Sequence, residues 1–332
     1  MGDLKVRRGP AIAALGGGHG LSAILRGLKL YTDNLTAIVT VADDGGGSGM
    51  LRQDLGMLPP GDIRNCMQSL ANVEPVMSQL LAYRFTDGSL AGQSFGNLLL
   101  AALYGISDSF DQAVARMSQV LAISGRVLPV TNANVDIEAM FENGTRVLGE
   151  SKIFQFKKEQ DCRVAHVRLL PGHPPALPET LEAIESAELI LLGPGSLYTS
   201  VIPNLLVDGV AEAISQSDAL KIYVCNIMTQ DGETEDMTAA DHVEALMEHG
   251  LGNLDICLCN NATVAPELLE RYREEDARPI VIDHDRLARL GVEVVERPLT
   301  TPVGARYARH EPELLAKAVL ELYQERGHTR IF

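Results

Sequence analysis

Two segments of the sequence place glycines directly after an apolar run, and such segments can bind anions through the backbone. The first is Gly16-Gly17-Gly18-His19-Gly20, which follows apolar residues and precedes a stretch with helical spacing. Glycines let the backbone approach a ligand closely, and the free N–H groups of a helix N-terminus attract phosphate. We therefore take Gly17, Gly18, His19 and Gly20 as candidate ligand-binding residues, with a tight turn as the alternative.

This loop matches the known phosphate-loop patterns only in part. A dinucleotide fingerprint requires Gly or Ala where Leu21 stands, and a Walker A loop requires Gly-Lys-Ser/Thr, which is absent. The broken fingerprint and the lack of a clear hydride-transfer acid argue against an NAD-dependent oxidoreductase. No Gly-x-Ser-x-Gly elbow occurs, so no Ser-His-Asp triad is recognisable. The loop by itself indicates an anion near a helix N-terminus.

The second glycine segment runs over residues 193–200 (Gly-Pro-Gly-Ser-Leu-Tyr-Thr-Ser) and follows the apolar run 189–192. Gly193 and Gly195 permit a close approach of the backbone, and the hydroxyl group of Ser196 can donate to a phosphate. Because no lysine is nearby, backbone amides and helix dipoles would meet the phosphate charge. A structural turn is again the alternative.

A third candidate is the acidic segment Asp43-Asp44-Gly45-Gly46-Gly47-Ser48-Gly49. A carboxylate at this place in a dinucleotide-binding fold holds ribose hydroxyls. Two adjacent carboxylates equally suit Mg²⁺, which takes one or two carboxylates together with substrate phosphate. We therefore take Asp43, Asp44 and Ser48 as candidate ligand-binding residues, and Asp43 and Asp44 as the candidate Mg²⁺ ligands. A solvated turn is the alternative.

Polar residues also follow other expected structural elements. Asn97 stands at the start of an expected helix, where it either contacts a ligand or caps the helix. Asn226, Thr229 and Gln230 follow an apolar strand and form a polar loop that suits the rim of a ligand site. Turn and capping chemistry is the alternative for this loop.

The elements that position these residues alternate between short apolar strands and helical stretches. Strands are expected at 10–15, 35–42, 189–192, 220–225, 256–259 and 279–282, and helices at 21–30, 62–73, 76–83, 97–103, 205–215 and 237–249. Near-continuous apolar strands separated by helices predict an α/β fold, with a mainly parallel sheet covered on both faces. In such sheets ligands bind outside the carboxyl ends of the strands, where the candidate loops stand.

Residues 126–170 follow a different pattern. Residues 135–141 alternate with period two, Asn143-Gly144 predicts a type I′ turn, and residues 145–148 would return as a second strand. Residues 164–170 alternate again. We therefore expect a small antiparallel excursion within one Rossmann-like, three-layer domain that spans residues 1–332.

Composition excludes several classes of protein. The formal net charge of -16 argues against a protein that coats nucleic acid or an anionic membrane. There is no signal-peptide core and no apolar run near the ~18 residues of a membrane span, so we expect a soluble, cytoplasmic protein. The five cysteines fit neither a disulfide framework nor a zinc ribbon and are expected to be buried, reduced thiols. His242 and His249 are expected on an exposed helix face.

The combination of these motifs resembles the YvcK family of gluconeogenesis factors, within the CofD-like superfamily. The resemblance starts from residues 14–21 followed by 41–49 and continues to residue 312 in order. Further matching segments are Pro60-Gly61-Asp62-Ile63-Arg64-Asn65, Ser94-Phe95-Gly96-Asn97-Leu98, Leu192–Ser200, Asn226-Ile227-Met228-Thr229-Gln230, Gly232-Glu233-Thr234 and Arg309-His310.

The resemblance implies a Rossmann-like fold that binds a nucleoside-diphosphate ligand at the strand ends. YvcK-like proteins bind UDP-sugars, notably UDP-N-acetylglucosamine, and are linked to growth on gluconeogenic carbon sources and to cell shape and wall synthesis. By the same resemblance Leu197 and Arg309 join the ligand-binding candidates, and His19 stands where many superfamily members have Thr.

CofD itself implies the alternative function, a Mg²⁺-dependent transferase that moves a phospholactyl group from a nucleoside-diphosphate donor to a hydroxyl acceptor. Its acceptor-binding Asp corresponds to the Asp43/Asp44 position of this sequence. A non-enzymatic, ligand-binding regulatory role is the favoured reading, with no cofactor except possible Mg²⁺. A homodimer is expected from the size and class of the protein.

Overall fold

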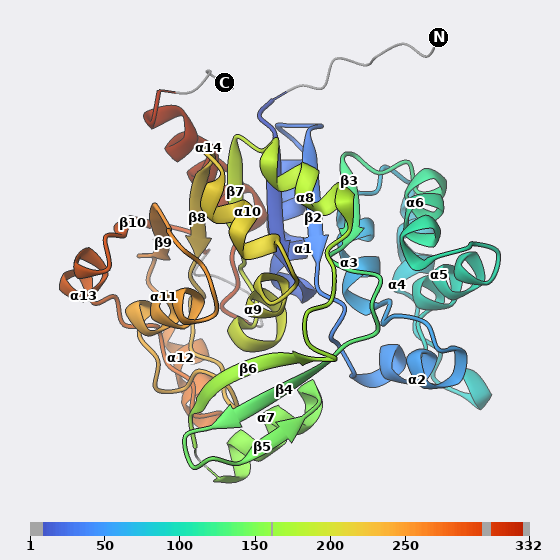
Figure 1. The fold of residues 1–332 in the computed structure, drawn as a ribbon, viewed down its shortest axis with the longest axis horizontal. Helices are drawn as coiled ribbons and strands as arrows, with labels where there is room; N and C mark the ends of the chain where they lie inside the picture. The colour runs from blue at the N-terminus through green and yellow to red at the C-terminus, as the bar shows by residue number, and fades with distance from the viewer. Residues whose placement is uncertain (1–8, 161, 301–306, 328–332) are drawn as a thin grey trace.

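The computed structural model describes residues 9–160, 162–300 and 307–327, and its centre is a seven-stranded parallel sheet (Figure 1). The strand order is β10-β9-β8-β7-β1-β2-β3, and every neighbouring pair is parallel. The strands are β1 (Ile12–Gly16), β2 (Leu35–Val39), β3 (Arg126–Pro129), β7 (Leu189–Leu192), β8 (Leu220–Val224), β9 (Ile256–Asn260) and β10 (Glu293–Arg297). The α/β fold class expected from the sequence is confirmed.

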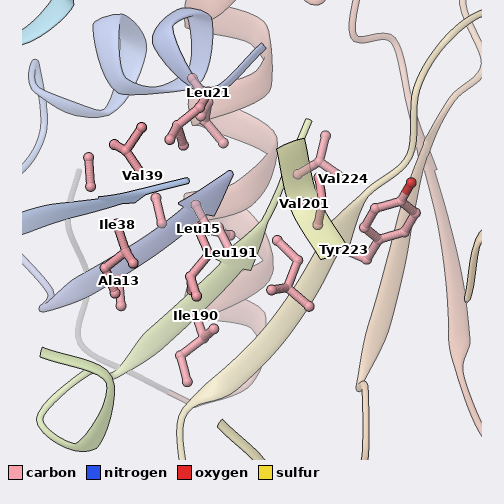
Figure 2. Close-up of a cluster of buried hydrophobic side chains, with 14 of the residues drawn as sticks. Ala13, Leu15, Leu21, Ile38, Val39, Ile190, Leu191, Val201, Tyr223 and Val224 are labelled. Atoms are coloured by element: carbon pink, nitrogen blue, oxygen red, sulfur yellow. The ribbon is translucent and has the colours of Figure 1, made fainter. Parts of the chain in front are cut away.

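The central strands form because most of their residues on both faces are apolar, with Thr36 and Lys221 as buried polar exceptions. Every residue of β1, β2, β7 and β8 is buried, as a parallel sheet between two helical layers requires. Figure 2 shows side chains of these strands, Leu15, Ile38 and Ile190 among them, in one cluster with Leu21 of the first helix. The core therefore fixes the strand ends that carry the glycine loops.

Helices cover both faces of the sheet. On one face α1 packs against α3 and α14, and on the other face α8, α9 and α10 pack together (Figure 1). The helices are α1 (Gly18–Leu28), α2 (Gly46–Leu55), α3 (Gly61–Leu70), α4 (Pro75–Ala82), α5 (Phe95–Gly105), α6 (Phe110–Val120), α7 (Glu150–Gln160), α8 (Pro178–Glu185), α9 (Ile202–Leu205), α10 (Val210–Gln216), α11 (Ala239–Glu248), α12 (Pro266–Glu274), α13 (His284–Arg289) and α14 (Pro312–Glu325).

The antiparallel excursion forms a separate three-stranded sheet in the order β5-β4-β6. It consists of β4 (Asp136–Phe141), β5 (Arg146–Leu148) and β6 (Val164–Leu170), with α7 between the last two strands. The excursion begins later than residue 126, because β3 pairs in parallel with β2 in the main sheet.

The turn of the β4–β5 hairpin differs from the expected type I′. Gly144 has a φ of 82°, but Asn143 does not have a positive φ, and a type I′ turn needs both central residues in that region. The N–H of Gly144 donates to the carbonyl of Phe141 at 2.8 Å, and Phe141 N–H donates to Thr145 at 2.9 Å. This pattern is a type I turn followed by a left-handed glycine.

The prediction of a strand at residues 279–282 is wrong. Residues 279–282 do not form a strand of the sheet; Pro279 makes only an isolated bridge with Met228. Pro279 offers no N–H for a ladder, so the short apolar run closes a loop. The last parallel strand of the sheet is β10, whose charged residues lie at the sheet edge.

The expectation that His242 and His249 face solvent is also wrong. His242 is fully buried on α11, and its Nδ1 lies 2.7 Å from the hydroxyl group of Tyr223. His249 is 5% exposed, accepts a hydrogen bond from the N–H of Val167 at 3.0 Å and stacks on His166. Burial lowers the pKa of each imidazole to about 4, so both rings are neutral packing groups near pH 7.

The cysteines are all free: Cys66, Cys225, Cys257 and Cys259 are buried, whereas Cys162 is half-buried. The prediction of buried thiols therefore holds for four of the five. None of the helices in residues 9–160, 162–300 and 307–327 has both the length and the hydrophobicity of a membrane span.

Candidate ligand-binding site

A cleft lies where the direction of the strand order reverses. In chain order the sheet runs outward from β1 through β2 to β3 on one side, and from β7 through β8 and β9 to β10 on the other. Ligands of doubly wound sheets bind at such a switch point, beyond the carboxyl ends of the two strands that flank it. Here those strands are β1 and β7, and the two glycine loops follow them directly.

The cleft has a volume of about 440 Å³, which falls in the usual range for small-molecule sites. It is lined by residues from five regions of the chain: Gly17, Gly18, His19, Gly20, Ala23, Pro194, Gly195, Ser196, Ser200, Asn226, Ile227, Met228, Thr229, Gln230, Tyr272, Tyr307, Ala308, Arg309 and His310. The structure thus brings together most of the candidates from the glycine loops, the loop after β8 and the C-terminal Arg309.

The first glycine loop leads directly into α1. Gly17 is the residue that precedes the helix, and Gly18 begins it with a φ of 63°. A Cβ atom at Gly20 would lie 2.3 Å from the carbonyl oxygen of Pro194, so only glycine lets the two loops meet here. The N-terminus of α1 consequently opens into the cleft between both loops.

The second glycine loop is held by an amide clasp from the loop after β8. The side chain of Asn226 donates to the carbonyl of Gly195 at 2.9 Å and accepts from its N–H at 3.3 Å. On the other side, the hydroxyl group of Ser196 lies 2.5 Å from Thr199 Oγ1 and donates to Glu233 Oε1 at 2.5 Å. Asn226 therefore positions the loop, whereas Ser196 belongs to a polar network beneath it.

Two candidate residues of the glycine segment lie outside the cleft. Leu197 is fully buried in the core. Gly193 has a φ of 75° and donates its N–H to the carbonyl of Leu15, so it closes the sheet above β1. Both residues shape the loop from within the fold.

The positive charge of the cleft comes from arginine. Arg309 is exposed, and its guanidinium group lies 5.0 Å from the centre of the Tyr307 ring. His19 is exposed at the mouth of the first loop; partial desolvation, followed by the charges of Arg309 and Arg64, lowers the pKa of its imidazole. His19 is therefore a neutral hydrogen-bonding group near pH 7, and the arginines carry the charge.

The loop after β8 forms the opposite rim. The N–H of Thr229 donates to the carbonyl of Arg278 at 2.7 Å, and its hydroxyl oxygen accepts from Arg278 N–H at 2.9 Å. Gln230 is exposed at the same rim. Tyr272, which the sequence reasoning missed, lies half-buried beside them and accepts a hydrogen bond from the N–H of Ala308 through its hydroxyl oxygen.

Beneath the first glycine loop lies a group of carboxyl side chains. A Cβ atom at Gly17 would come within 2.5 Å of Asp62 Oδ2. Burial, and then the neighbouring charge of Asp43, raise the pKa of Asp62 to about 7. Burial and the same charge raise the pKa of Glu150 to about 8, and burial raises that of Asp43 as well. Such mutually shifted carboxyl groups mark a candidate site for a cation or for proton transfer.

Asp43 and Asp44 have different hydrogen-bond partners. Asp43 faces Asp62 and Glu150 and is hydrogen-bonded by its neighbour Ser48. Asp44 accepts hydrogen bonds from the N–H and the hydroxyl group of Ser151, at 3.0 and 2.8 Å. The two carboxylates as a pair of Mg²⁺ ligands stay a prediction.

Asp43 and Asp62 nevertheless fit the needs of a divalent ion that also binds substrate phosphate, because such an ion takes one or two carboxylates and relieves their repulsion. In the described part of the chain, only three cysteines form a group of three or more metal-ligand side chains within 4.8 Å of one another. The acidic group is therefore no closed metal cage.

Asn97 lies behind this acidic group. It is 3% exposed, and its Oδ1 accepts a hydrogen bond from Arg64 Nε at 3.2 Å. The N-cap of α5 is Ser94, which accepts from the N–H of Asn97. Asn97 therefore orients Arg64, whose charge acts on both Asp62 and His19.

The sequence offered a signal for some of the missed residues. Asp62, Arg64 and Glu233 stand within segments that match the family pattern, and this match is the sequence signal for them. Glu150 and Tyr272 gave no signal, because only tertiary packing brings them to the site.

A family model described as 2-phospho-L-lactate transferase CofD matches residues 12–300. The chain belongs to the CofD family. A relative from Thermoanaerobacterium thermosulfurigenes is 52% identical to this CofD-family chain. The alignment covers 98% of the chain and all of the relative. The protein named "Gluconeogenesis factor" of Bacillus subtilis strain 168 is 46% identical over 95% of the chain and 99% of its own length.

A solved structure supports the same relationship. The crystal structure of a UPF0052 family protein from Bacillus halodurans superposes on this CofD-family chain with a TM-score of 0.89 at 44% identity. The match covers 93% of the chain and 98% of that structure. The Rossmann-like fold and the family resemblance expected from the sequence are thus confirmed.

Proposed function

We propose that the chain binds a nucleoside-diphosphate sugar of the UDP-N-acetylglucosamine type and acts as a regulatory protein for growth on gluconeogenic carbon sources. The observation that carries the binding proposal is the meeting of two glycine loops at the switch point of the sheet. Gly20 and Pro194 touch there, Asn226 clasps the second loop, and the cleft opens between them. Backbone amides from two loops suit a diphosphate, which presents acceptor oxygens on both phosphates.

The remaining walls of the cleft suit the other parts of such a ligand. Tyr272 and Tyr307 supply aromatic surface for a base, and Arg309 supplies a cation beside them. Thr229 and Gln230 offer polar groups at the rim. The lining therefore combines phosphate, aromatic and hydroxyl recognition in one cleft of about 440 Å³.

The cellular part of the proposal follows the name of the Bacillus subtilis relative, "Gluconeogenesis factor". A link to cell shape and wall synthesis, a cytoplasmic location and a homodimer belong to the same proposal. The homodimer is tested directly by light scattering of the purified protein, where a monomer mass would contradict it.

Isothermal titration calorimetry of the full chain with UDP-N-acetylglucosamine at physiological salt tests the binding. We expect saturable binding that NAD does not displace, and Arg309→Ala weakens it at least tenfold. Arg289→Ala is the matched control, because Arg289 is exposed on α13 and is not among the residues that line the cleft. No heat at millimolar ligand would overturn the proposal.

The carboxyl side chains of Asp43, Asp62 and Glu150, beneath the first glycine loop, favour a second function. Asp43 and Asp62 would hold Mg²⁺, which would neutralise the charge on a transferred phosphoryl-linked group. The glycine loops would orient the donor, and Glu150 beside Asp43 would take or release a proton. These are the requirements of a CofD-like transferase, in which the hydroxyl oxygen of the acceptor attacks the phosphorus of the phospholactyl-type group, the bond to the nucleoside-diphosphate donor breaks, and a nucleoside monophosphate leaves.

An assay that supplies the CofD substrates with Mg²⁺, read by mass spectrometry, tests this second function. Product formation that Asp62→Asn abolishes, while UDP-N-acetylglucosamine still binds, would establish transfer. Absence of product with the folded wild-type chain would leave binding as the function.

A further inference from the structure

Three cysteines that are far apart in the sequence meet inside the sheet. Cys225 directly follows β8, and Cys257 and Cys259 lie on β9. Their sulfur atoms all lie within 4.8 Å of one another, and Cys257 Sγ and Cys259 Sγ are 3.7 Å apart. Each of the three residues is at most 2% exposed, and none forms a disulfide.

The sheet itself holds the sulfur atoms in place. Cys257 and Cys259 are two residues apart on one strand, so their side chains point to the same face. Val224 pairs with Leu258 in parallel register, and the N–H of Cys225 donates to the carbonyl of Leu258 at 3.0 Å. This ladder places Cys225 beside Cys259, so the three sulfur positions depend on backbone hydrogen bonds and not on a loop.

The spacing of the sulfur atoms is that of a metal–thiolate site. Metal–sulfur bonds are about 2.3 Å long, so three thiolates around one ion lie about 4 Å apart. The sulfur separations here, from 3.7 Å to within 4.8 Å, cover that value. All three residues are buried, so a bound ion would take sulfur ligands in place of water, and thiolates select soft ions.

We propose that Cys225, Cys257 and Cys259 form a closed site for one thiophilic d¹⁰ metal ion. Cu(I) and Zn(II) share this chemistry. No other His, Cys, Asp or Glu among the described residues joins the group within 4.8 Å. Structural zinc sites almost always have four protein ligands, so a site with three sulfur ligands favours Cu(I).

The proposed metal site lies next to the residue that holds the second glycine loop. Cys225 directly precedes Asn226, whose amide clasps Gly195 of the second glycine loop. An ion shared by the ends of β8 and β9 would fix the strand end that presents Asn226. The metal site does not depend on the proposed ligand of the cleft, and the experiment below does not use that ligand.

Anaerobic titration of the reduced, full-length protein tests the site. Cu(I) is added against a chromophoric Cu(I) chelator, Zn(II) is added against a zinc indicator, and Co(II) serves as a spectroscopic substitute for zinc. We expect one equivalent of ion per chain with a thiolate-to-metal charge-transfer band. X-ray absorption at the metal edge should show a first shell of three sulfur atoms.

Variants separate this cluster from the other thiols. Cys257→Ser and Cys225→Ser should each lose the stoichiometric ion and the charge-transfer band. Cys66→Ser, which removes a buried thiol elsewhere, and Cys162→Ser, which removes the half-buried thiol, should retain both.

The proposal is overturned if the folded wild-type chain retains no ion, or if Cys257→Ser retains the wild-type stoichiometry. It is also overturned if Cys162→Ser alone abolishes binding, since the ion would then sit on an accessible thiol. If a cluster variant fails to fold, the X-ray absorption of the wild-type protein decides: a first shell without three sulfur atoms contradicts the site.

Discussion

Replacing Asp62 should change how the stability of the protein depends on pH. Burial, and then the charge of Asp43, raise the pKa of the folded Asp62 from 3.8 to about 7. Since the folded protein retains a proton that the unfolded chain has released, stability falls as the pH rises through 7. Between about pH 5.5 and about pH 8.5 this one group should lower the free energy of unfolding by about 2 kcal/mol.

Urea denaturation of the wild type and of Asp62→Asn across this pH range measures the effect. The amide cannot ionise, so the variant should lose about 2 kcal/mol less than the wild type between the two ends of the range. Asp54→Asn, which changes an exposed carboxylate on α2, should follow the wild-type curve. Buried histidines act in the opposite direction below pH 6.5 and cancel in the difference between variants.

The reasoning is refuted if the wild-type and Asp62→Asn curves run parallel. It is also refuted if the wild type gains stability relative to the variant as the pH rises. A Mg²⁺ arm extends the test to the proposed metal ligands. If Asp43 and Asp62 hold the ion, Mg²⁺ stabilises the wild type more at about pH 8.5 than at about pH 5.5, because the carboxyl groups must be ionised to bind it.

Three further changes test the loops and the packing. Gly20→Ala places a Cβ 2.3 Å from the carbonyl oxygen of Pro194 and should abolish ligand binding in calorimetry, whereas Gly105→Ala, with open space around it, should not. Asn226→Ala removes both hydrogen bonds to the second loop and should weaken the binding of UDP-N-acetylglucosamine about tenfold. Unchanged affinity would show that these two hydrogen bonds do not contribute to ligand binding. Thr238→Ala removes the N-cap of α11 and should cost about 1 kcal/mol in urea denaturation, without changing affinity.

The parts of the site that the sequence predicted are those that depend on local chemistry. An apolar strand, glycines and a helical stretch stand next to one another in both loops, so a short window contains the whole signal. Gly17, Gly20 and Gly195 accordingly line the cleft. The switch point then brings the two loops together, because the carboxyl ends of β1 and β7 are neighbours.

The parts that the sequence did not predict depend on long-range packing. Asp43 and Glu150 are separated by more than a hundred residues, and only the return of the antiparallel sheet brings α7 to the glycine loop. His242 has the residue type of a solvated helix position, but Tyr223 on β8 covers it. The thiol cluster joins two strands in the same way, and spacing along the chain did not reveal it.

The chain has a net charge of -16, yet the proposed ligand is an anion, and three half-buried carboxyl side chains beside the cleft resolve this conflict. No lysine is among the described residues that line the cleft, and Arg309 is its arginine. Asp43, Asp62 and Glu150 stand close by, and all three have raised pKa values.

If these carboxyl groups were ionised and unpaired, their field would repel a diphosphate from the N-terminus of α1. Either protons or a divalent cation must therefore neutralise them when the ligand binds. These two cases predict opposite pH dependences. A proton-neutralised site loses affinity as the pH rises through about 7, the pKa of Asp62, whereas a Mg²⁺-neutralised site gains it. Ligand titrations on both sides of this pH, with and without Mg²⁺, therefore decide whether protons or Mg²⁺ neutralise the site when the ligand binds.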